Sequence, residues 1–139
     1  MNWHKTTLTV ETNGKGLYAF TTAVQKQLAG WGVQEGMCHL FIQHTSASLL
    51  ISESYDPTAR RDLETYLERL APENQPWMQH TLEGPDDSSS HLRAMLTQTS
   101  LSIPIDEGRL SLGRWQGIYL FEHRVRSHTR RVLLRCLSI

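Results

Sequence analysis

The chain has 139 residues, a length that predicts a single folded domain over residues 1–139. Of these residues 39% are hydrophobic and 20% charged, a composition that excludes disordered and collagen-like proteins. Its 14 Lys and Arg balance 14 Asp and Glu, which argues against a nucleic-acid partner because modules that bind nucleic acids carry an excess of cations. No apolar run approaches the roughly 18 residues of a membrane span, and the first residues lack the basic and apolar segments of a secretory signal, so we expect a cytoplasmic protein without membrane contact.

The first half of the chain is predicted to hold two strands and a short helix. Residues 5–11 alternate between apolar and polar side chains, as a half-buried strand does. Thr21 or Thr22 is expected to cap a helix that ends near Gly30, because hydroxyl groups accept hydrogen bonds from the first unpaired N–H groups of a helix. Residues 37–52 alternate over most of their length and predict one long strand with a bend or bulge.

The clearest helix is predicted over residues 57–70. Asp56 is a suitable N-cap, Pro57 is tolerated in the first turn where its missing N–H costs nothing, and Pro72 ends the pattern. The apolar side chains of this segment recur at helical spacing and form one stripe that is expected to pack on the core: Leu63, Tyr66, Leu67 and Leu70.

The second half begins with a polar stretch and continues as a helix and several strands. A segment as long as residues 73–87 without periodicity is typical of a functional loop. Residues 89–98 predict a short helix that buries Leu92, Met95 and Leu96. The remaining pattern predicts strands over 101–105, 109–113, 115–122 and 130–137. Because the regular strand and helix alternation of parallel sheets is missing, we expect an α+β fold built on an antiparallel sheet or sandwich.

The charges are distributed unevenly along the chain. Residues 52–87 contain nine acids and three arginines, whereas residues 109–139 contain seven arginines and one acid. These two segments are either solvated surfaces of opposite sign or the walls of an anion-binding pocket.

Histidine is frequent in this chain, and His44 lies on the strand predicted over 37–52. If that strand continues without a bulge, the two-residue period of strand side chains places Ser46 and Ser48 on the same face as His44. An imidazole and two hydroxyls in a row suit the floor of a polar pocket, although a single histidine on a strand is more often structural. Glu53 follows directly and is either a carboxylate of the same pocket or a solvated strand end.

A second group of candidate residues surrounds the start of the helix predicted over 89–98. His80 precedes the helix, Asp87 lies just before it, and His91 falls in its first turn, where unpaired N–H groups attract anions. Two or three histidines and one carboxylate are a suitable ligand set for zinc or another transition metal. We therefore expect His80, Asp87 and His91 to converge with His44.

A third group of candidates lies in the C-terminal part. Trp115 offers a flat surface on which a ring can stack, although a tryptophan in a strand is usually part of the core, and Gln116 offers a hydrogen-bonding amide. Arg124 and Arg130 flank a loop rich in cations, and a guanidinium group is suited to two-pronged phosphate binding. These residues are candidates for binding a small phosphorylated substrate.

Taken together, these segments resemble the YjbQ-like protein family, often called secondary thiamine-phosphate synthases. The matching segments run in family order along nearly the whole chain: His44-Thr45-Ser46-Ala47-Ser48-Leu49, Glu53 with Asp56-Pro57, Asp62, His80, Gly84-Pro85-Asp86-Asp87 with His91-Leu92, Pro104 with Gly108-Arg109, Gly113-Arg114-Trp115-Gln116-Gly117-Ile118, and Glu122-His123-Arg124. The chain departs from the family pattern at Thr97-Gln98-Thr99, where a glycine is frequent, and at Arg114, where a threonine is frequent before the tryptophan.

The resemblance implies a jelly-roll-like antiparallel β-sandwich with two or three short helices, assembled as a homotrimer. It also implies a weak thiamine-phosphate synthase activity, which joins a pyrimidine pyrophosphate to a thiazole phosphate. On this hypothesis the catalytic residues are His44, Glu53, Asp87 and His91. The substrate-binding residues are Ser46, Ser48, Trp115, Gln116, Arg124 and Arg130. The ligands of a divalent metal, zinc or magnesium, are His44, His80 and His91.

Two other functions stay open on the same residues. The histidines and the carboxylate equally suit a metal-dependent hydrolase of a small phosphorylated or carbonyl substrate, in which zinc activates a water. The polar cluster also suits a protein that binds a phosphorylated metabolite without turning it over. Metal content and product formation distinguish the three functions.

Overall fold

Strands and helices alternate irregularly along the chain, and the computed structural model describes all of residues 1–139. The three helices are α1 (Thr21–Gly30), α2 (Pro57–Leu70) and α3 (Asp87–Leu96). The strands are β1 (Asn2–Thr12), β2 (Gly16–Ala19), β3 (Gly36–Ile42), β4 (Ala47–Glu53), β5 (Ser100–Asp106), β6 (Arg109–Leu110), β7 (Gln116–Glu122) and β8 (His128–Ser138). All paired strands are antiparallel, so the predicted α+β fold with an antiparallel core is confirmed.

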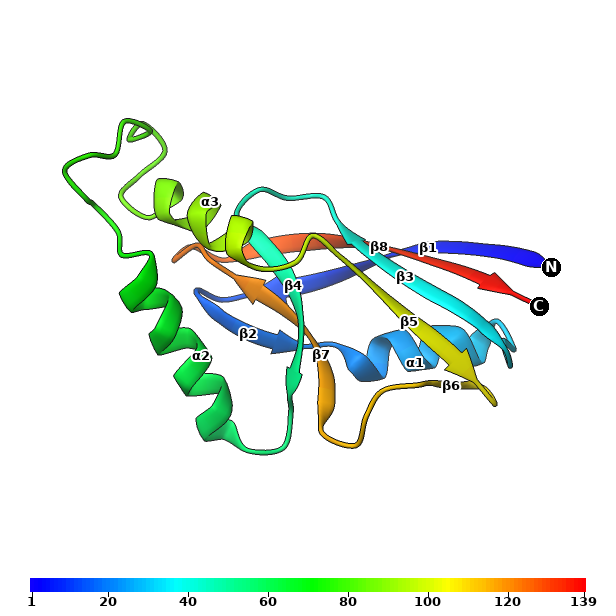
Figure 1. Ribbon diagram of the computed structural model, residues 1–139. Helices are drawn as coiled ribbons and strands as arrows, with labels where there is room; N and C mark the ends of the chain where they lie inside the picture. The colour runs from blue at the N-terminus through cyan, green and yellow to red at the C-terminus, as the bar shows by residue number, and fades with distance from the viewer.

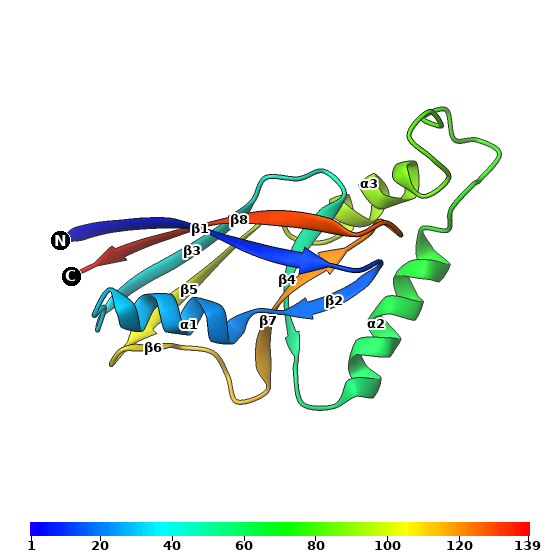
Figure 2. The same cartoon turned by 180° about the vertical axis from the view of Figure 1, so that it is seen from behind.

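The strands form two sheets that share one core. The five-stranded sheet has the order β1-β8-β3-β5-β6, and the three-stranded sheet has the order β2-β7-β4. Helix α1 lies against one face of the five-stranded sheet, and α2 and α3 lie beside the three-stranded sheet (Figure 1, and from behind in Figure 2). The main cluster of buried apolar side chains joins α1 to both sheets, through residues such as Leu28, Leu40 and Leu120. No helix combines the length and the apolar character needed to cross a membrane.

Helix α2 has the bounds and the N-cap that the sequence predicts. The Asp56 carboxylate accepts a hydrogen bond from the Thr58 N–H at 2.9 Å. The predicted apolar stripe is only partly buried, since Leu67 is buried whereas Tyr66 and Leu70 are 61% and 50% exposed. The reason is that α2 covers only a small apolar cluster on the three-stranded sheet.

Helix α1 begins where it is expected, but the expected cap is wrong. Phe20 is the N-cap residue, and no side chain caps this helix. Thr21 Oγ1 instead accepts a hydrogen bond from the Ile118 N–H at 2.8 Å. The hydroxyl therefore fastens α1 to β7, and a contact with a distant strand replaces the local bond that the sequence predicts.

The long strand predicted over residues 37–52 is wrong, because the chain changes sheets within it. β3 pairs with β5 and β8, whereas β4 pairs with β7. Residues 43–46 cross between the sheets, and the His123 N–H donates to the Ser46 carbonyl at the end of the crossing. The strand predicted over 109–113 shortens to β6, and β2 is a strand that the hydropathy pattern does not predict.

Helix α3 does not bury the apolar side chains that its sequence predicts. Leu92 is half-buried, and Met95 and Leu96 are 72% and 50% exposed, so the expected orientation is wrong. The Arg93 guanidinium donates to the Ala71 carbonyl at the end of α2, at 3.1 Å. This contact turns a polar face of α3 inward. The buried side chains of α3 are Asp87, Ser89, Ser90 and Arg93.

Candidate functional site

Two histidines meet one carboxylate at the start of α3. Asp87 is the first residue of this helix, and His91 lies one turn later, while His80 comes from the loop between α2 and α3. His80 Nε2 and His91 Nε2 lie 2.8 and 3.0 Å from Asp87 Oδ2. The Asp87 side chain is 6% exposed, whereas those of His80 and His91 are 55% and 36% exposed. The structure therefore brings three sequence-predicted site residues together, with both imidazoles open to solvent.

The ring of His91 is oriented by the chain that crosses between the sheets. Its Nδ1 lies 2.8 Å from the Thr45 carbonyl oxygen. Because a carbonyl oxygen only accepts, Nδ1 carries the proton, and Nε2 is the nitrogen that faces Asp87. Thr45 contributes a backbone atom, so no side-chain pattern in the sequence reveals this contact.

A guanidinium joins this cluster to the connection between β7 and β8. Arg124 Nη1 donates to Asp87 Oδ1 at 2.6 Å, and Arg124 Nε donates to Asp86 Oδ2 at 3.0 Å. Burial by itself raises the pKa of Asp86, but hydrogen bonds from the Val125 N–H and from Arg124 hold that pKa below its usual value. Asp86 therefore stays ionised at neutral pH and ties the loop before α3 to the end of β7.

His44 lies outside this cluster. Its Nε2 accepts a hydrogen bond from the Arg131 N–H at 2.8 Å, and its Nδ1 lies 3.4 Å from Arg130 Nη1. Burial, followed by the charge of Arg130, lowers the pKa of His44. The ring is neutral at neutral pH, and one of its nitrogens is already occupied by the backbone of β8. The ligand set that the geometry offers is His80, Asp87 and His91, whose ligand atoms lie within 4.8 Å of one another.

Arg130 and Ser46 belong to a buried ion-pair network. Arg130 Nε and Nη2 donate to the two carboxylate oxygens of Glu122, and Nη2 also donates to Ser46 Oγ at 2.9 Å. Arg130 is 3% exposed and Glu122 is fully buried. Burial tends to raise the pKa of Glu122, but hydrogen bonds from Arg130 and Thr12 hold it below the usual glutamate value. Both predicted substrate contacts therefore face the interior rather than an open pocket.

Ser48 is also buried, in a chain of hydrogen bonds that ends at His123. Thr97 Oγ1 donates to Ser48 Oγ, which lies 2.8 Å from His123 Nε2. Burial, followed by the charge of Arg93, lowers the pKa of His123 to about 3, and its neutral ring packs against Phe121. Ser48 and His123 thus support α3 from inside the molecule.

Glu53, Trp115 and Gln116 lie at the opposite end of the three-stranded sheet. Glu53 pairs with Gln116 in the β4 and β7 ladder, whereas the end near the cluster is the pair of Ala47 and Glu122. At roughly 3.3 Å per strand residue, the two ends are about 20 Å apart. The structure does not bring these three residues to the cluster within one chain.

Two cavities open beside the cluster. One, of about 260 Å³, is lined by His80 and by the loop before α3: Asn74, Gln75, Met78, Thr81, Gly84, Pro85 and Ser88. The other, of about 480 Å³, shares Gly84 and Pro85 with the first and is also lined by Arg124 and Arg126. The larger cavity has a size typical of ligand pockets, and the smaller one lies just below that range.

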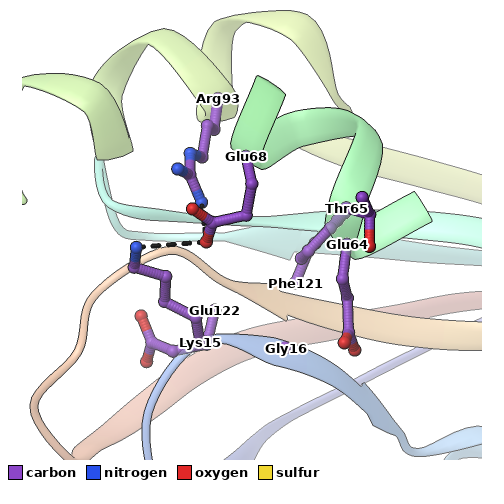
Figure 3. A pocket seen from close by; sticks show the side chains of 8 residues that line it. All are labelled: Lys15, Gly16, Glu64, Thr65, Glu68, Arg93, Phe121 and Glu122. Carbon is purple, nitrogen blue, oxygen red and sulfur yellow. Dashed lines mark hydrogen bonds and ion pairs between the residues drawn. The ribbon is translucent and has the colours of Figure 1, made fainter. Parts of the chain in front are cut away.

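A third cavity, of about 250 Å³, lies between α2, α3 and β2, and no residue of the cluster lines it (Figure 3). Its charged side chains pair with one another. Lys15 Nζ and Arg93 Nη1 each lie 3.2 Å from Glu68 Oε1, and Glu64 accepts a hydrogen bond from the Leu17 N–H. Because these polar groups are already satisfied, this cavity is a weaker candidate than the cluster.

Comparison with known proteins finds one family along nearly the whole chain. The family model described as UPF0047 protein YjbQ-like matches residues 6–138. A UPF0047 protein of Synechocystis is 44% identical over 131 residues, which cover 94% of this chain and 89% of that protein. The UPF0047 protein YjbQ of Escherichia coli is 41% identical over 132 residues, which cover 94% of this chain and 95% of that protein.

Solved structures share the fold. A conserved hypothetical protein of Thermus thermophilus superposes with a TM-score of 0.86 at 37% identity, covering 95% of this chain and 99% of that one. A YbjQ-like protein of unknown function from Sulfolobus solfataricus also has a TM-score of 0.86, at 20% identity, covering 99% of this chain and 100% of that one. At 20% identity, the similarity to the Sulfolobus solfataricus protein shows only that the fold is shared. The names of these four proteins state no activity.

Proposed function

The chain belongs to the UPF0047 family of YjbQ-like proteins, and from that premise we propose that it is an enzyme acting on a small phosphorylated substrate at His80, Asp87 and His91. These three residues bind a divalent metal in this proposal. The reaction is the condensation of a pyrimidine pyrophosphate with a thiazole phosphate to give thiamine phosphate. The observation that carries the proposal is the contact between His91 Nε2 and Asp87 Oδ2.

The hydrogen bonding of His91 leaves a place for a cation. Because the Nδ1–H donates to the Thr45 carbonyl, a neutral ring presents the lone pair of Nε2 to Asp87 Oδ2, 3.0 Å away. Two acceptors at that distance repel each other unless a proton or a metal ion lies at the contact. His80 Nε2 lies 2.8 Å from the same oxygen, so one metal ion can bind His80, Asp87 and His91 together. A carbonyl partner on the second ring nitrogen is typical of metal-binding histidines.

The donor set favours zinc over magnesium. Imidazole nitrogens suit zinc and other transition metals, whereas magnesium prefers a shell of oxygen atoms. Bonds of about 2.0–2.1 Å would place the ligand atoms of a tetrahedral zinc about 3.3 Å apart. The two Nε2 to Oδ2 distances of 2.8 and 3.0 Å lie near that value, and all three ligand atoms lie within 4.8 Å of one another. Three protein ligands also leave a fourth position for substrate or water, as in catalytic zinc sites.

Thiamine-phosphate formation needs a cation at the leaving group. The bond between the pyrimidine methylene carbon and pyrophosphate oxygen breaks, the electron pair leaves with pyrophosphate, and the thiazole nitrogen forms a bond to that carbon. A divalent metal held by His80, Asp87 and His91 would supply charge stabilisation for the departing oxygen. The cavity of about 260 Å³ beside His80 supplies amide and hydroxyl groups for phosphate oxygens, including Ser88 in the first turn of α3.

Hydrolysis is the second candidate function, and the open fourth position of the ligand set favours it. A zinc ion held by His80, Asp87 and His91 would lower the pKa of a bound water, so that the resulting hydroxide could attack a phosphoryl or carbonyl group while the bond to the leaving alcohol or phosphate breaks and that group takes up a proton. Both candidates use the same three protein ligands. They differ in whether water or the thiazole nitrogen is the nucleophile, whereas a protein that only binds a phosphorylated metabolite forms no product.

Product analysis of the wild type and of His91→Ala separates these functions. Both proteins are purified without a histidine tag from a host that lacks its main thiamine-phosphate synthase, and each is incubated with the two precursors and zinc. We expect thiamine phosphate and near-stoichiometric zinc with the wild type, and neither with His91→Ala. His4→Ala is the matched control, because its ring stacks on Trp31 and belongs to β1, whose N-terminal end lies at the opposite side of the molecule from α3 in Figure 1.

Each alternative outcome of this assay has a clear meaning. Hydrolysis of a precursor without thiamine phosphate would replace the synthase by the hydrolase. Equal product from both proteins would assign the activity to a contaminant, and tight binding without any product would leave a binding protein. Full activity of a wild type that holds no metal would exclude the metal ion.

We also propose that the chain forms a homotrimer and that the outer face of the five-stranded sheet takes part in the contact. Trp3, Leu137 and Met37 are paired across β1, β8 and β3 and therefore share this face. Their exposed fractions are 62%, 42% and 44%, and Pro104 of β5 continues the row. No helix covers this face in Figures 1 and 2. Adjacent exposed apolar residues are typical of a contact between protein chains.

The Met37→Lys variant is expected to weaken this assembly, because it places a charge in an apolar contact without a partner. Light scattering coupled to gel filtration should find three chains per particle in the wild type and fewer in the variant. Ala23→Lys on the exposed side of α1 is the control and should leave the particle mass unchanged. A wild type that is monomeric at micromolar concentration would contradict the assembly.

A further inference from the structure

We propose that Arg124 is a positioning residue that holds Asp87 in the His80, Asp87 and His91 cluster, rather than a residue that contacts the phosphate of the substrate. This inference rests on the function proposed above. It assigns a role to the guanidinium that differs from the phosphate-binding role that its residue type predicts.

All three guanidinium nitrogens of Arg124 already have protein partners. Nη1 donates to Asp87 Oδ1 at 2.6 Å, Nε donates to Asp86 Oδ2 at 3.0 Å, and Nη2 donates to the Glu83 carbonyl at 2.9 Å. The side chain is 13% exposed. These bonds use three of the five N–H groups, so a phosphate bound to the remaining two would share the guanidinium with the carboxylates of Asp86 and Asp87, which repel an anion.

The contact with Arg124 decides which oxygen of Asp87 faces the histidines. Because Nη1 holds Oδ1, the carboxylate cannot rotate freely, and Oδ2 stays within 2.8 and 3.0 Å of His80 Nε2 and His91 Nε2. The guanidinium also offsets part of the charge of the Asp87 carboxylate, whose side chain is 6% exposed. A residue behind a ligand that fixes its orientation is a regular part of metal sites.

The loop before α3 is shaped around the same guanidinium. Gly84 has a φ of +103°, a left-handed conformation that side chains other than that of glycine rarely adopt. The turn at this glycine directs the Glu83 carbonyl to Nη2, and the Val125 N–H donates to Asp86 Oδ2 at 2.8 Å. Glu83, Asp86 and Asp87 therefore accept four hydrogen bonds from Arg124 and Val125, directly after the end of β7.

Arg124 itself is anchored on the core. Its own N–H and that of His123 donate to Glu122 Oε2, and Glu122 is fully buried in its ion pair with Arg130. The position of the guanidinium is thus set by the buried end of the three-stranded sheet. We infer that the core places Asp87 through Arg124, which links a rigid element to a cluster that stands partly on a loop.

Zinc affinity, a spectroscopic signature and pyrophosphate binding distinguish positioning from substrate contact. Arg124→Gln, Arg124→Lys and Arg126→Gln are compared, and Arg126 is the matched control because it lines the same cavity of about 480 Å³ and makes no side-chain hydrogen bond. We expect Arg124→Gln to weaken zinc binding by roughly 10–100-fold, as loss of an orienting partner does. The visible absorption spectrum of the site loaded with Co²⁺ should also change. Arg124→Lys, which retains one charged contact, should lie between wild type and Arg124→Gln, and Arg126→Gln should match the wild type.

Pyrophosphate is titrated into each protein at saturating zinc. Unchanged pyrophosphate affinity of Arg124→Gln supports positioning, whereas unchanged zinc affinity together with lost pyrophosphate binding overturns it. Hydrogen exchange of residues 83–87 in metal-free protein is the readout that does not depend on the proposed function, and faster exchange is expected in Arg124→Gln. If the wild type binds no zinc, the metal of the proposed function is rejected, and unchanged exchange at residues 83–87 would then reject the role of Arg124 as well.

Discussion

The Asp87→Asn variant is expected to keep its fold and to lose more than about 100-fold in zinc affinity and in turnover, because losing a ligand costs more than the roughly 10–100-fold of losing an orienting partner. An amide oxygen still accepts the hydrogen bond from Arg124, but it lacks the charge that holds a cation between His80 Nε2 and His91 Nε2. Isothermal titration with zinc and the product assay measure the two losses.

A second aspartate separates this effect from a general loss of negative charge. Asp106→Asn alters an exposed residue at the end of β5 and should change neither zinc binding nor turnover. Circular dichroism and thermal unfolding are the measurements that test whether Asp87→Asn is folded. A folded Asp87→Asn variant with wild-type zinc affinity and wild-type turnover would rule out the cluster as the functional site.

The Arg130→Met variant is expected to lower the free energy of unfolding by about 3–5 kcal/mol, since breaking a buried ion pair leaves an unpaired charge in the interior. The carboxylate that it leaves is Glu122, which is fully buried and takes hydrogen bonds from Arg130 on both of its oxygens. Urea denaturation at neutral pH measures the loss. Arg131→Met, at the exposed neighbouring position, should stay within about 0.5 kcal/mol of the wild type.

The pH dependence of this difference follows from the direction of the pKa of Glu122. In the wild type this pKa lies below the usual glutamate value of 4.5, so ionised Glu122 contributes stability above that value and loses it as the pH falls through the lower folded pKa. In Arg130→Met, burial raises the pKa, and protonation of Glu122 relieves the penalty as the medium becomes acidic. The gap between the two proteins should therefore narrow from pH 7 towards pH 4.

A double variant tests whether the unpaired charge is the cause. Arg130→Met combined with Glu122→Gln removes both charges, and it should recover a large part of the stability that Arg130→Met loses. Its stability should also vary less with pH in the acidic range. If the double variant is as unstable as Arg130→Met at every pH, lost packing rather than the unpaired carboxylate explains the effect.

The helix whose ends are set by local interactions agrees with its sequence prediction. Helix α2 has its predicted bounds, because the cap at Asp56 and the proline after it act within one turn. The predictions of which side chains are buried are less accurate. Met95 and Leu96 are exposed because hydrogen bonds from Arg93 to the end of α2 turn a polar face of α3 inward, and hydropathy alone does not register such bonds.

In the candidate site, too, the sequence predicts contacts between residues that are near one another in the chain but not contacts between distant segments. His80, Asp87 and His91 lie close together in the chain, and the sequence predicts that they converge at the start of a helix. The helix begins at Asp87 rather than at the predicted residue 89, so Asp87 and His91 are one helical turn apart. His44 belongs to the crossing between the two sheets, where its ring accepts a hydrogen bond from β8 instead of joining the cluster. Trp115 is separated from the cluster by the length of a strand, a distance that follows only from the pairing of β4 with β7.

The sequence by itself determined the α+β class, the helices, and the histidines and carboxylate of the cluster, because these follow from short-range periodicity and from residues near one another in the chain. Only the tertiary structure decided that Thr45 orients His91 and that Arg124 holds Asp87. It also decided that Arg130 is buried with Glu122. These contacts join segments far apart in the sequence, and which segments meet depends on the sheet that each strand enters.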